Sequence, residues 1–541
     1  MASYSKYICF LAALTLGILP SQTAPAIDTI LLRPATWSEA VQPWKEYRES
    51  QGHKILELDS VHDAATNLAK LQETYQRHKD TLRYIVLAGD VDPRSPNSIG
   101  THYRESKALV HFGGDKLIAT DNPYADFDGD ELPDVAIARI PADSRQELEK
   151  YFARVMKYET QESFDLWRRD IHVVAGVGGF GALADSVIEM TTRRFLADRV
   201  PGWSEMTMTQ ATTNSHYCPD PEKFSEVTTA RMNQGGLFWV YIGHGHVRTL
   251  DYLRTKQGQL YPIFTENDLP AVRCKHSPIA VFLACYTGAF DATLDSLAER
   301  LILQDDGPIA SIAASRVSGP YGLAMLADGM LDNFYVKQLP TLGEVVQLSK
   351  RRLLAPELEK AEAIKNPQIK MISAIASAMS PKDYDLRAER MEHVWQMHLL
   401  GDPMLRIRYP KTMELELPAK SKPGEELSIQ GTCELKGKLS VELAYIREKV
   451  RSELSEIPTG SQTAEGRKGL QERYNRANDR ILLTKSLDCS PGPFSLSLQI
   501  PADLANGKYC IRAFAKSEDN WQVGYQEISI RRPRNTSTSG Q

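Results

Sequence analysis

The chain has 541 residues, of which 42% are hydrophobic and 25% are charged, and its formal net charge is −5. A chain of this length and composition can bury large hydrophobic cores and is expected to divide into about three domains. The charges are spread along the sequence with no basic block, which argues against nucleic acid as a partner.

The first 25 residues have the pattern of an export signal. Lys6 supplies a positive charge, residues 7–19 form an apolar stretch, and residues 21–26 are mostly small, as at a cleavage site. The apolar stretch, at about 13 residues, is short for a transmembrane helix, although an uncleaved anchor is the alternative. No later segment approaches a membrane-spanning length. We therefore expect an exported mature chain without a membrane span, located in the periplasm, at the cell surface or outside the cell.

Strand and helix patterns alternate through residues 26–169. Buried strands are predicted at residues 29–32 and 84–88, and amphipathic helices at residues 38–49, 64–79 and 146–159. Such alternation predicts βαβ units on a mainly parallel sheet, which here forms an N-terminal α/β lobe.

Four carboxylates of this lobe surround a tight glycine turn. Asp126, Asp128 and Asp130 occupy alternate positions, and Asp134 follows four residues later. The spacing is similar to the start of a calcium loop, but the twelfth position is Ile137, where an EF-hand has Glu. We predict a structural Ca2+ ion held by these four aspartates, and a solvated acidic turn is the alternative.

Residues 170–410 repeat the α/β pattern and form the second predicted lobe, which we expect to carry the catalytic residues. Its buried strands are expected at residues 171–175, 237–242, 279–284 and 308–313. A glycine-rich segment, residues 176–181, follows the first strand, but its surroundings do not fit a dinucleotide-binding loop. We interpret the segment as a loop that lines a cleft, and we expect no organic cofactor.

Two of these strands end in residues suited to nucleophilic chemistry. The strand at 237–242 runs into a Gly-His-Gly turn centred on His244, and the strand at 279–284 runs into Cys285. Ligands of open α/β sheets bind beyond the carboxyl ends of the strands, so neighbouring strands would place both residues in one cleft. A thiol activated by an imidazole is a nucleophile for acyl transfer. The backbone N–H groups of Gly245 and Cys285 are then candidates for the oxyanion hole.

Beyond residue 410 the pattern changes to short alternating strands. Those at residues 413–417, 439–443, 494–498 and 509–513 predict a β-sandwich over residues 411–533, with a disordered tail at 534–541. The charged segment 447–478 is helix-prone and is interpreted as an insertion or a mobile loop.

The cysteines argue against a disulfide scaffold and against a zinc site. Cys9 lies in the predicted signal, and the six others are too few for a disulfide-rich fold in a chain of this size. One pair among Cys433, Cys489 and Cys510 is a candidate for a bridge, and the sequence leaves the pair open. No Cys-x-x-Cys or His-Glu-x-x-His spacing is present.

Four stretches resemble the gingipain family of cysteine peptidases. They are residues 84–90, 128–141, 241–245 and 284–290, and residues 399–407 are similar to the segment that closes the catalytic domain of the family. The resemblance covers residues 28–410 and implies a caspase-like α/β fold followed by an immunoglobulin-like β-sandwich. It also implies that His244 is the general base and acid, that Cys285 is the nucleophile, and that the substrates are proteins or peptides.

The same resemblance bears on specificity and activation. Family members that cleave after basic residues place an acid in the S1 pocket; Asp185 falls near that position, and Tyr321 is similar to the aromatic pocket wall. Arg or Lys is therefore expected at P1. Val177 occupies the place of the acid that assists the catalytic histidine, which leaves a dyad. The fold is expected to begin directly after the signal, so latency through a cleaved prosegment is not expected.

The sequence therefore predicts a secreted cysteine-type endopeptidase that acts through a thioester acyl-enzyme at His244 and Cys285. One alternative is a processing transpeptidase that uses the same dyad to join the acyl group to an amine. The other is a non-catalytic, caspase-like binding or scaffold protein, which the missing assisting acid suggests.

Overall fold

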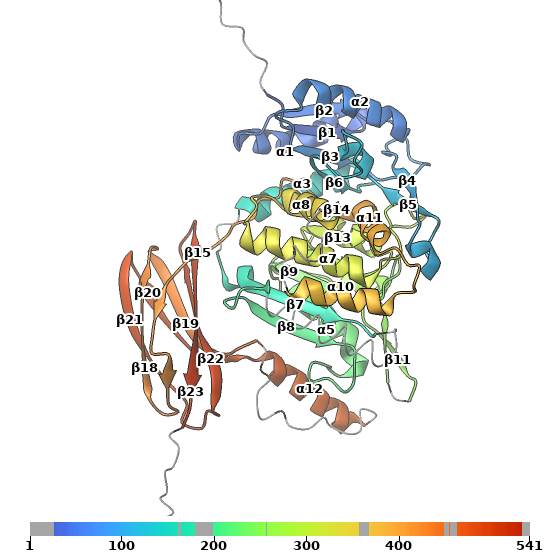
Figure 1. The fold of residues 1–541 in the computed structure, drawn as a ribbon. Helices are drawn as coiled ribbons and strands as arrows, with labels where there is room; N and C mark the ends of the chain where they lie inside the picture. The colour runs from blue at the N-terminus through green and yellow to red at the C-terminus, as the bar shows by residue number, and fades with distance from the viewer. Residues whose placement is uncertain are drawn as a thin grey trace, which may run out of the picture.

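A ten-stranded sheet runs through both predicted lobes in the order β2-β1-β3-β6-β14-β13-β12-β9-β7-β8 (Figure 1). The computed structural model of the chain describes residues 26–160, 164–178, 199–255, 257–355, 367–447, 449, 454 and 463–532. The predicted signal, Asp185 and the predicted tail lie outside these residues. The strands of the sheet are β1 (Thr29–Arg33), β2 (Ile55–Asp59), β3 (Tyr84–Ala88), β6 (Ala136–Ile140), β7 (Asp170–Ala175), β8 (Glu205–Gln210), β9 (Phe238–Ile242), β12 (Ile279–Leu283), β13 (Ala310–Ala314) and β14 (Met397–Leu400).

The two lobes correspond to the two halves of this sheet, except that β14 of the second lobe lies in the half formed by the first. Strands β2, β1, β3, β6 and β14 run parallel to one another, and so do β13, β12, β9, β7 and β8. Because β13 and β14 pair antiparallel, the two halves point in opposite directions. The predicted fold class, with mainly parallel sheets in two α/β lobes, is confirmed. Strand β14, at the end of the second lobe, joins the halves by pairing with β6 at Leu400 and Arg139.

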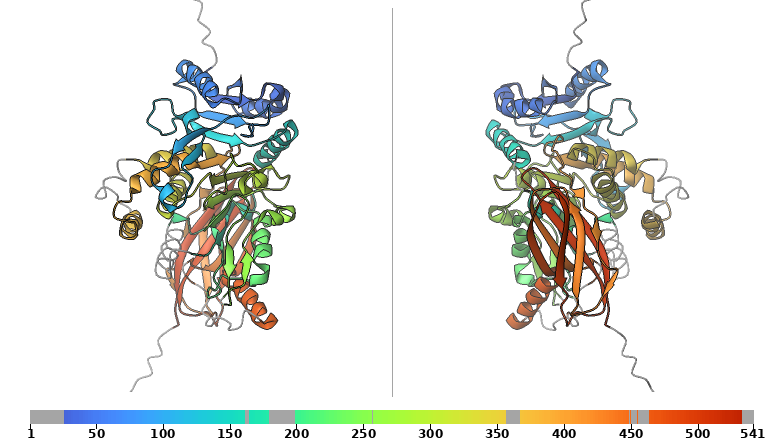
Figure 2. Two further views of the ribbon diagram at one scale, coloured as in Figure 1. Left: turned by 90° about the vertical axis from the view of Figure 1, so that its right-hand side faces the viewer. Right: turned by 90° about the vertical axis from the view of Figure 1, so that its left-hand side faces the viewer.

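Helices cover both faces of the sheet, as Figure 2 shows from two sides. Every residue of β1, β3, β12 and β13 is buried, which agrees with their unbroken apolar runs. The helices are α1 (Ser38–Ser50), α2 (Ala64–His78), α3 (Arg145–Thr160), α5 (Phe224–Asn233), α6 (Leu297–Leu303), α7 (Pro320–Leu331), α8 (Leu342–Leu353), α10 (Pro367–Met379) and α11 (Leu386–Gln396). In the described part of the chain, no helix has the length and apolar character needed to cross a membrane.

Two short hairpins stand apart from the sheet. They are β4 (His102–Glu105) with β5 (Leu117–Thr120), and β10 (Tyr252–Arg254) with β11 (Leu260–Pro262). The first belongs to the N-terminal lobe, and the second follows the turn of the Gly-His-Gly motif.

The C-terminal domain is a β-sandwich, as predicted, with one six-stranded and one three-stranded sheet. Its elements are β15 (Lys411–Thr412), β16 (Leu415–Glu416), β17 (Lys420–Ser421), β18 (Glu426–Cys433), β19 (Gly437–Tyr445), α12 (Ala464–Asn478), β20 (Ile481–Cys489), β21 (Gly492–Gln499), β22 (Gly507–Lys516) and β23 (Trp521–Ile530). The strand predicted at residues 413–417 is found in a shorter form, as the two-residue β16. Strand β15 pairs with β23 of one sheet and β16 with β18 of the other, so the chain changes sheets between them.

Buried charges join the sandwich to the second lobe. Glu442 of β19 contacts Arg169, which directly precedes β7, at 2.7 Å, and it contacts Arg512 of β22 at 2.8 Å. Arg512 also pairs with Glu205 of β8 at 2.6 Å. Charges that lie away from solvent thus attach the sandwich to the second lobe, and the two domains share one interior at this point.

The charged segment 447–478 is helical over α12, which lies under the edge of the ten-stranded sheet (Figure 1). The Asn478 side chain donates to Met208 O at 3.0 Å and accepts from Met208 N–H at 2.7 Å. The hydroxyls of Tyr474 and Thr209 are 2.8 Å apart. Strand β8 is the edge strand on this side, so α12 protects backbone groups that are otherwise open to pairing.

Candidate active site

His244 and Cys285 follow neighbouring strands at the same register. Strands β9 and β12 pair in parallel with Ile242 opposite Leu283, and each reactive residue comes two positions later. The expectation that the two strands are neighbours is confirmed. His244 is exposed and Cys285 is half-buried, at the carboxyl edge where open α/β sheets bind ligands.

The turn that carries His244 lies directly against the turn that carries Cys285. A Cβ atom on Gly245 would be 2.7 Å from the carbonyl oxygen of Cys285 and 2.8 Å from Cγ2 of Thr287. Such distances are shorter than a carbon side chain tolerates, so glycine is the residue that permits this approach. The neighbouring histidine, His246, is exposed, and its N–H donates to Thr249 O at 2.9 Å.

Tyr241 holds the backbone of the histidine turn. Its hydroxyl donates to His244 O at 2.7 Å and accepts from Asp251 N–H at 3.4 Å. The side chain is fully buried, and burial, together with the Asp251 charge, raises the pKa of the phenol. The sequence analysis did not single out this residue. A tyrosine in an otherwise apolar strand, three positions before the histidine, is the signal that was available.

The thiol of Cys285 lies beside the N-terminus of α7. Ser318 N–H donates to Sγ of Cys285 at 3.3 Å, and Ser318 is followed by Gly319, the N-cap of α7. Burial raises the pKa of the Cys285 thiol, and the Ser318 N–H opposes that increase. The positive end of the helix dipole also favours an anion at this place. The surroundings therefore favour the thiolate only in part, and a base is needed to form it.

Two backbone donors are available where an oxyanion is expected to form. In the described chain, neither the N–H of Gly245 nor the N–H of Cys285 donates a hydrogen bond to another residue. A buried N–H group without an acceptor is uncommon in folded proteins. The N–H of Cys285 also faces its own Sγ, where it favours the thiolate, and both N–H groups are candidates for an oxyanion hole.

The first lobe supplies one side of the surroundings of Cys285. Tyr286 adopts a φ of 56°, which is unusual for a residue other than glycine. Its N–H donates to Arg316 O at 3.1 Å, and its hydroxyl donates to Asp115 in the turn between β4 and β5. Arg316 pairs with Asp291 at 2.6 Å and donates to Leu117 O of β5 at 2.8 Å. Contacts at both ends of the residue thus hold the strained backbone directly after the thiol.

The structure describes one of the two residues predicted to line the S1 pocket, Tyr321, but not the other, Asp185. Asp185 lies outside the described residues. Tyr321 is in the first turn of α7, is 7% exposed, and accepts a hydrogen bond at its hydroxyl from Arg390 of α11 at 3.0 Å. Its role as a pocket wall stays a prediction. Val177, in the place of the assisting acid, is partly buried and packs against the main core.

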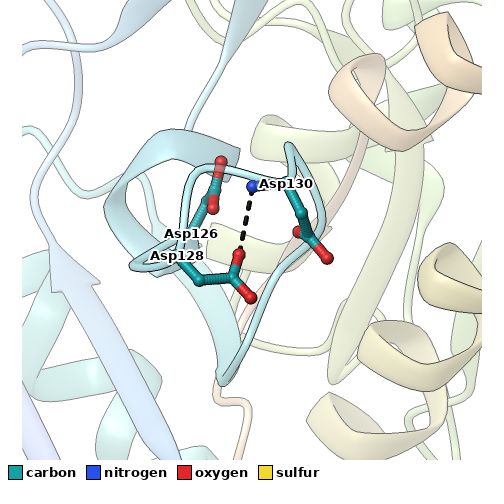
Figure 3. A group of neighbouring side chains, drawn as sticks. All are labelled: Asp126, Asp128 and Asp130. Carbon is teal, nitrogen blue, oxygen red and sulfur yellow. Dashed lines mark hydrogen bonds between the residues drawn. The ribbon is translucent and has the colours of Figure 1, made fainter.

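Three of the four predicted calcium ligands lie together. Asp126, Asp128 and Asp130 place one carboxylate oxygen each within 4.8 Å of one another (Figure 3). Asp130 N–H donates to Asp128 Oδ1 at 3.0 Å, which closes the turn. Burial raises the pKa of Asp126, and the charges of Asp130 and Asp134 add to this effect. Hard cations prefer such a set of carboxylate oxygens.

Asp134, the fourth predicted ligand, is not part of that group. Its carboxylate accepts from Phe127 N–H at 2.8 Å and pairs with Arg351 at 3.3 Å. Arg351 also lies 3.6 Å from Asp130 and supplies part of the positive charge that the aspartates attract. The structure thus places Asp134 as a residue that holds the loop.

Comparison with known proteins identifies a peptidase family that matches most of the chain. The model of peptidase family C25 matches residues 22–408. No curated protein sequence matches the chain.

Three solved structures share the fold over nearly the whole chain. The Arg-specific cysteine proteinase gingipain R (RgpB) is 14% identical with a TM-score of 0.51, and the match covers 95% of this chain and 100% of that one. A complex of the pro- and mature domains of Porphyromonas gingivalis RgpB is 15% identical with a TM-score of 0.50, covering 93% and 100%. A structure described only as a protease is 16% identical with a TM-score of 0.53, covering 94% and 98%. At these identities the likeness shows the fold alone.

Proposed function

Because the chain belongs to peptidase family C25, a family of cysteine peptidases that act on proteins or peptides, we propose that it is an exported endopeptidase with His244 and Cys285 as its dyad. The main support is the matched register of the two residues on β9 and β12, with the close approach of their turns at Gly245. Family membership favours catalysis over the scaffold alternative.

The proposed reaction begins with transfer of the Cys285 proton to His244. The thiolate attacks the scissile carbonyl carbon, and a C–S bond forms while the carbonyl oxygen takes the negative charge. The N–H groups of Gly245 and Cys285, neither of which donates to another residue in the described chain, stabilise that oxyanion. When the C–N bond breaks, His244 returns the proton to the leaving amine and a thioester remains. Water, deprotonated by His244, then hydrolyses the thioester and restores the thiol.

A contact of the backbone is proposed to contribute to the orientation of the histidine. Val177 supplies no acid, but the hydrogen bond from the Tyr241 hydroxyl to His244 O restrains the turn that carries the imidazole. A dyad of this kind still provides a general base.

Preference for Arg or Lys at P1 is the finer part of the proposal. It rests on the resemblance of the sequence around Asp185 to the gingipain family, since a carboxylate facing a bound guanidinium or ammonium discriminates by charge. Asp185→Asn is expected to lower kcat/KM for Arg and Lys substrates selectively. An unchanged ratio between basic and apolar P1 substrates would exclude Asp185 from the pocket.

A structural Ca2+ ion at Asp126, Asp128 and Asp130 is proposed as well, with support from the gathered carboxylate oxygens. Calcium is expected to raise the melting temperature of the purified protein, and EGTA to reverse the effect. Asp128→Asn should weaken the response, whereas Asp488→Asn, at an exposed surface pair, should not. An equal response in both variants would exclude the site.

The dyad is tested by hydrolysis of fluorogenic peptides that differ at P1, with reductant and calcium present. Wild-type protein and Cys274→Ala are expected to turn over substrate, because Cys274 is a buried cysteine of the same lobe away from the site. Cys285→Ala and His244→Ala are expected to lose activity while keeping the circular dichroism of the wild type. Turnover by folded Cys285→Ala would refute the assignment.

A further inference from the structure

Two cysteines of the β-sandwich face each other in its interior. Cys433 is the last residue of β18 and Cys489 is the last residue of β20, and their Sγ atoms are 3.6 Å apart. The two residues are 1% and 8% exposed. The sequence left the pairing among three cysteines open, and the structure brings these two together.

The strand topology explains why the two thiols meet. Strand β18 belongs to the three-stranded sheet and β20 to the six-stranded sheet. After each cysteine the chain crosses to the opposite sheet, through residues 434–436 to β19 and through residues 490–491 to β21. The register sets Cys433 opposite Gly492 and Cys489 opposite Gly437, so both crossings lie at the same end of the sandwich. A bond between the thiols would therefore link the two sheets.

The surroundings of the two thiols do not favour metal binding or a role as reactive thiols. Each thiol donates to Leu435 O at 3.5 Å, and such sulfur hydrogen bonds are weak, so little is lost when the protons leave. Among the described residues, the one group of three or more side chains that could hold a metal is the aspartate cluster, so no third ligand joins these cysteines. Burial and the neighbouring Cys433 raise the pKa of the Cys489 thiol to about 11. The pair is thus poor as a metal site, and Cys489 is a poorly reactive thiol in the folded protein.

Cys510, the third cysteine of the domain, has a different setting. It lies within β22, is 2% exposed, and its thiol contacts the carbonyl oxygens of Ala444 and Tyr445 at 3.5 and 3.7 Å. It therefore serves as a matched internal control, being buried in the same domain without a cysteine partner.

We propose that Cys433 and Cys489 form a disulfide that ties the two sheets of the sandwich together. The two thiols lose two protons and two electrons as the S–S bond forms. A disulfide-class oxidant accepts them: one thiolate attacks it to give a mixed disulfide, the second thiolate displaces the remaining half, and two thiols of the oxidant are released. The inference concerns the sandwich alone and holds whether or not the dyad is catalytic.

Peptide mapping tests the bond in the full-length protein. The protein is folded with oxidised glutathione, denatured, alkylated with iodoacetamide without prior reduction, digested, and analysed by mass spectrometry. We expect a cross-linked peptide containing Cys433 and Cys489, two hydrogens lighter than the sum of its parts, with Cys510 alkylated. Alkylation of both Cys433 and Cys489, or a bridge from either one to Cys510, would overturn the proposal.

Thiol counting gives an independent readout. In denaturant, the oxidised wild type should show two fewer reactive thiols than the same protein after dithiothreitol, and Cys510→Ser should show the same difference. Cys433→Ser and Cys489→Ser should each abolish it. Dithiothreitol should lower the melting temperature of the oxidised wild type but leave that of Cys489→Ser unchanged, because the cross-link restricts the unfolded chain. Equal melting temperatures of the wild type with and without reductant would contradict a stabilising bridge. If a variant fails to fold, peptide mapping of the wild type still decides.

Discussion

Glu442 is the residue through which the attachment of the sandwich can be tested most directly. Its carboxylate accepts hydrogen bonds from Arg169 at 2.7 and 3.1 Å and from Arg512 at 2.8 and 3.1 Å. The three side chains are between 2% and 4% exposed. In Glu442→Ala, Arg512 would keep Glu205, whereas Arg169 would lose the one carboxylate with which it forms an ion pair in the described chain.

The loss of stability expected for Glu442→Ala follows from the burial of these charges. Removing one partner of a buried ion pair costs about 3–5 kcal/mol, because the remaining charge stays desolvated. The pKa of Glu442 is lowered, since the hydrogen bonds and charges of Arg169 and Arg512 outweigh the effect of burial. The carboxylate therefore stabilises the fold above the ordinary Glu pKa, about 4.3, and this contribution is lost as the pH falls through its folded value. At pH 7 we expect a loss near the lower end of that range, about 3 kcal/mol, because one arginine keeps a partner.

Urea unfolding followed by tryptophan fluorescence measures the effect. Trp203 of the second lobe and Trp521 of the sandwich, two of the seven tryptophans, lie edge to face at 5.7 Å, so separation of the two domains changes part of the emission. The free energy of unfolding is compared between wild type, Glu442→Ala and Asp488→Ala. Asp488 is the matched control because its pair with Lys438, on the same sandwich, is exposed, and such pairs contribute about 0–1 kcal/mol.

Glu442→Ala should lower the free energy of unfolding clearly more than the control Asp488→Ala does. A loss below about 1 kcal/mol, or one equal to that of Asp488→Ala, would refute the view that the buried charges fasten the sandwich to the lobe.

Three further outcomes are expected. Gly245→Ala should lower kcat/KM by about 100-fold or more with unchanged circular dichroism, because its Cβ would be 2.7 Å from Cys285 O and would displace an oxyanion donor; near-normal activity would contradict the close approach. Burial raises the pKa of Asp170 to about 7, so the folded state holds this proton more tightly than the unfolded state, and stability should fall as the pH rises from about 4 to 7. Chemical denaturation across this range should show a shallower fall for Asp170→Asn, and an identical slope would argue against burial as the cause. Asn478→Ala removes both hydrogen bonds to Met208, so hydrogen exchange measured by mass spectrometry should become faster along β8, and unchanged exchange would show that α12 does not protect that edge.

The bounds of helices whose apolar residues repeat at a clear period could be predicted closely from the sequence. Helices α1, α2 and α3 begin and end within one residue of the predictions, because their apolar residues repeat at helical spacing. The strand predicted at residues 413–417 is shortened to two residues, Leu415–Glu416, in the structure. Alternation identifies an extended chain but not its partner, and here the chain leaves one sheet for the other.

In the candidate site, too, some residues could be predicted from the sequence and others could not. His244 and Cys285 could be found in the sequence because each ends an apolar strand, and that position alone implies the binding edge of a parallel sheet. Tyr241 and Ser318 were not found, because their contacts with the turn of His244 and with the Cys285 thiol depend on how separate segments fold back.

Residue types and their periods thus determined the α/β and β-rich regions, the strand-end positions of His244 and Cys285, and the acidic loop. Tertiary structure alone decided that β14 joins two antiparallel halves into one sheet, that α12 covers β8, and that Cys433 meets Cys489 with Cys510 left aside. Pairings of this kind join residues far apart in the chain. Their register is set by how whole sheets and helices pack, which no local pattern of residues encodes.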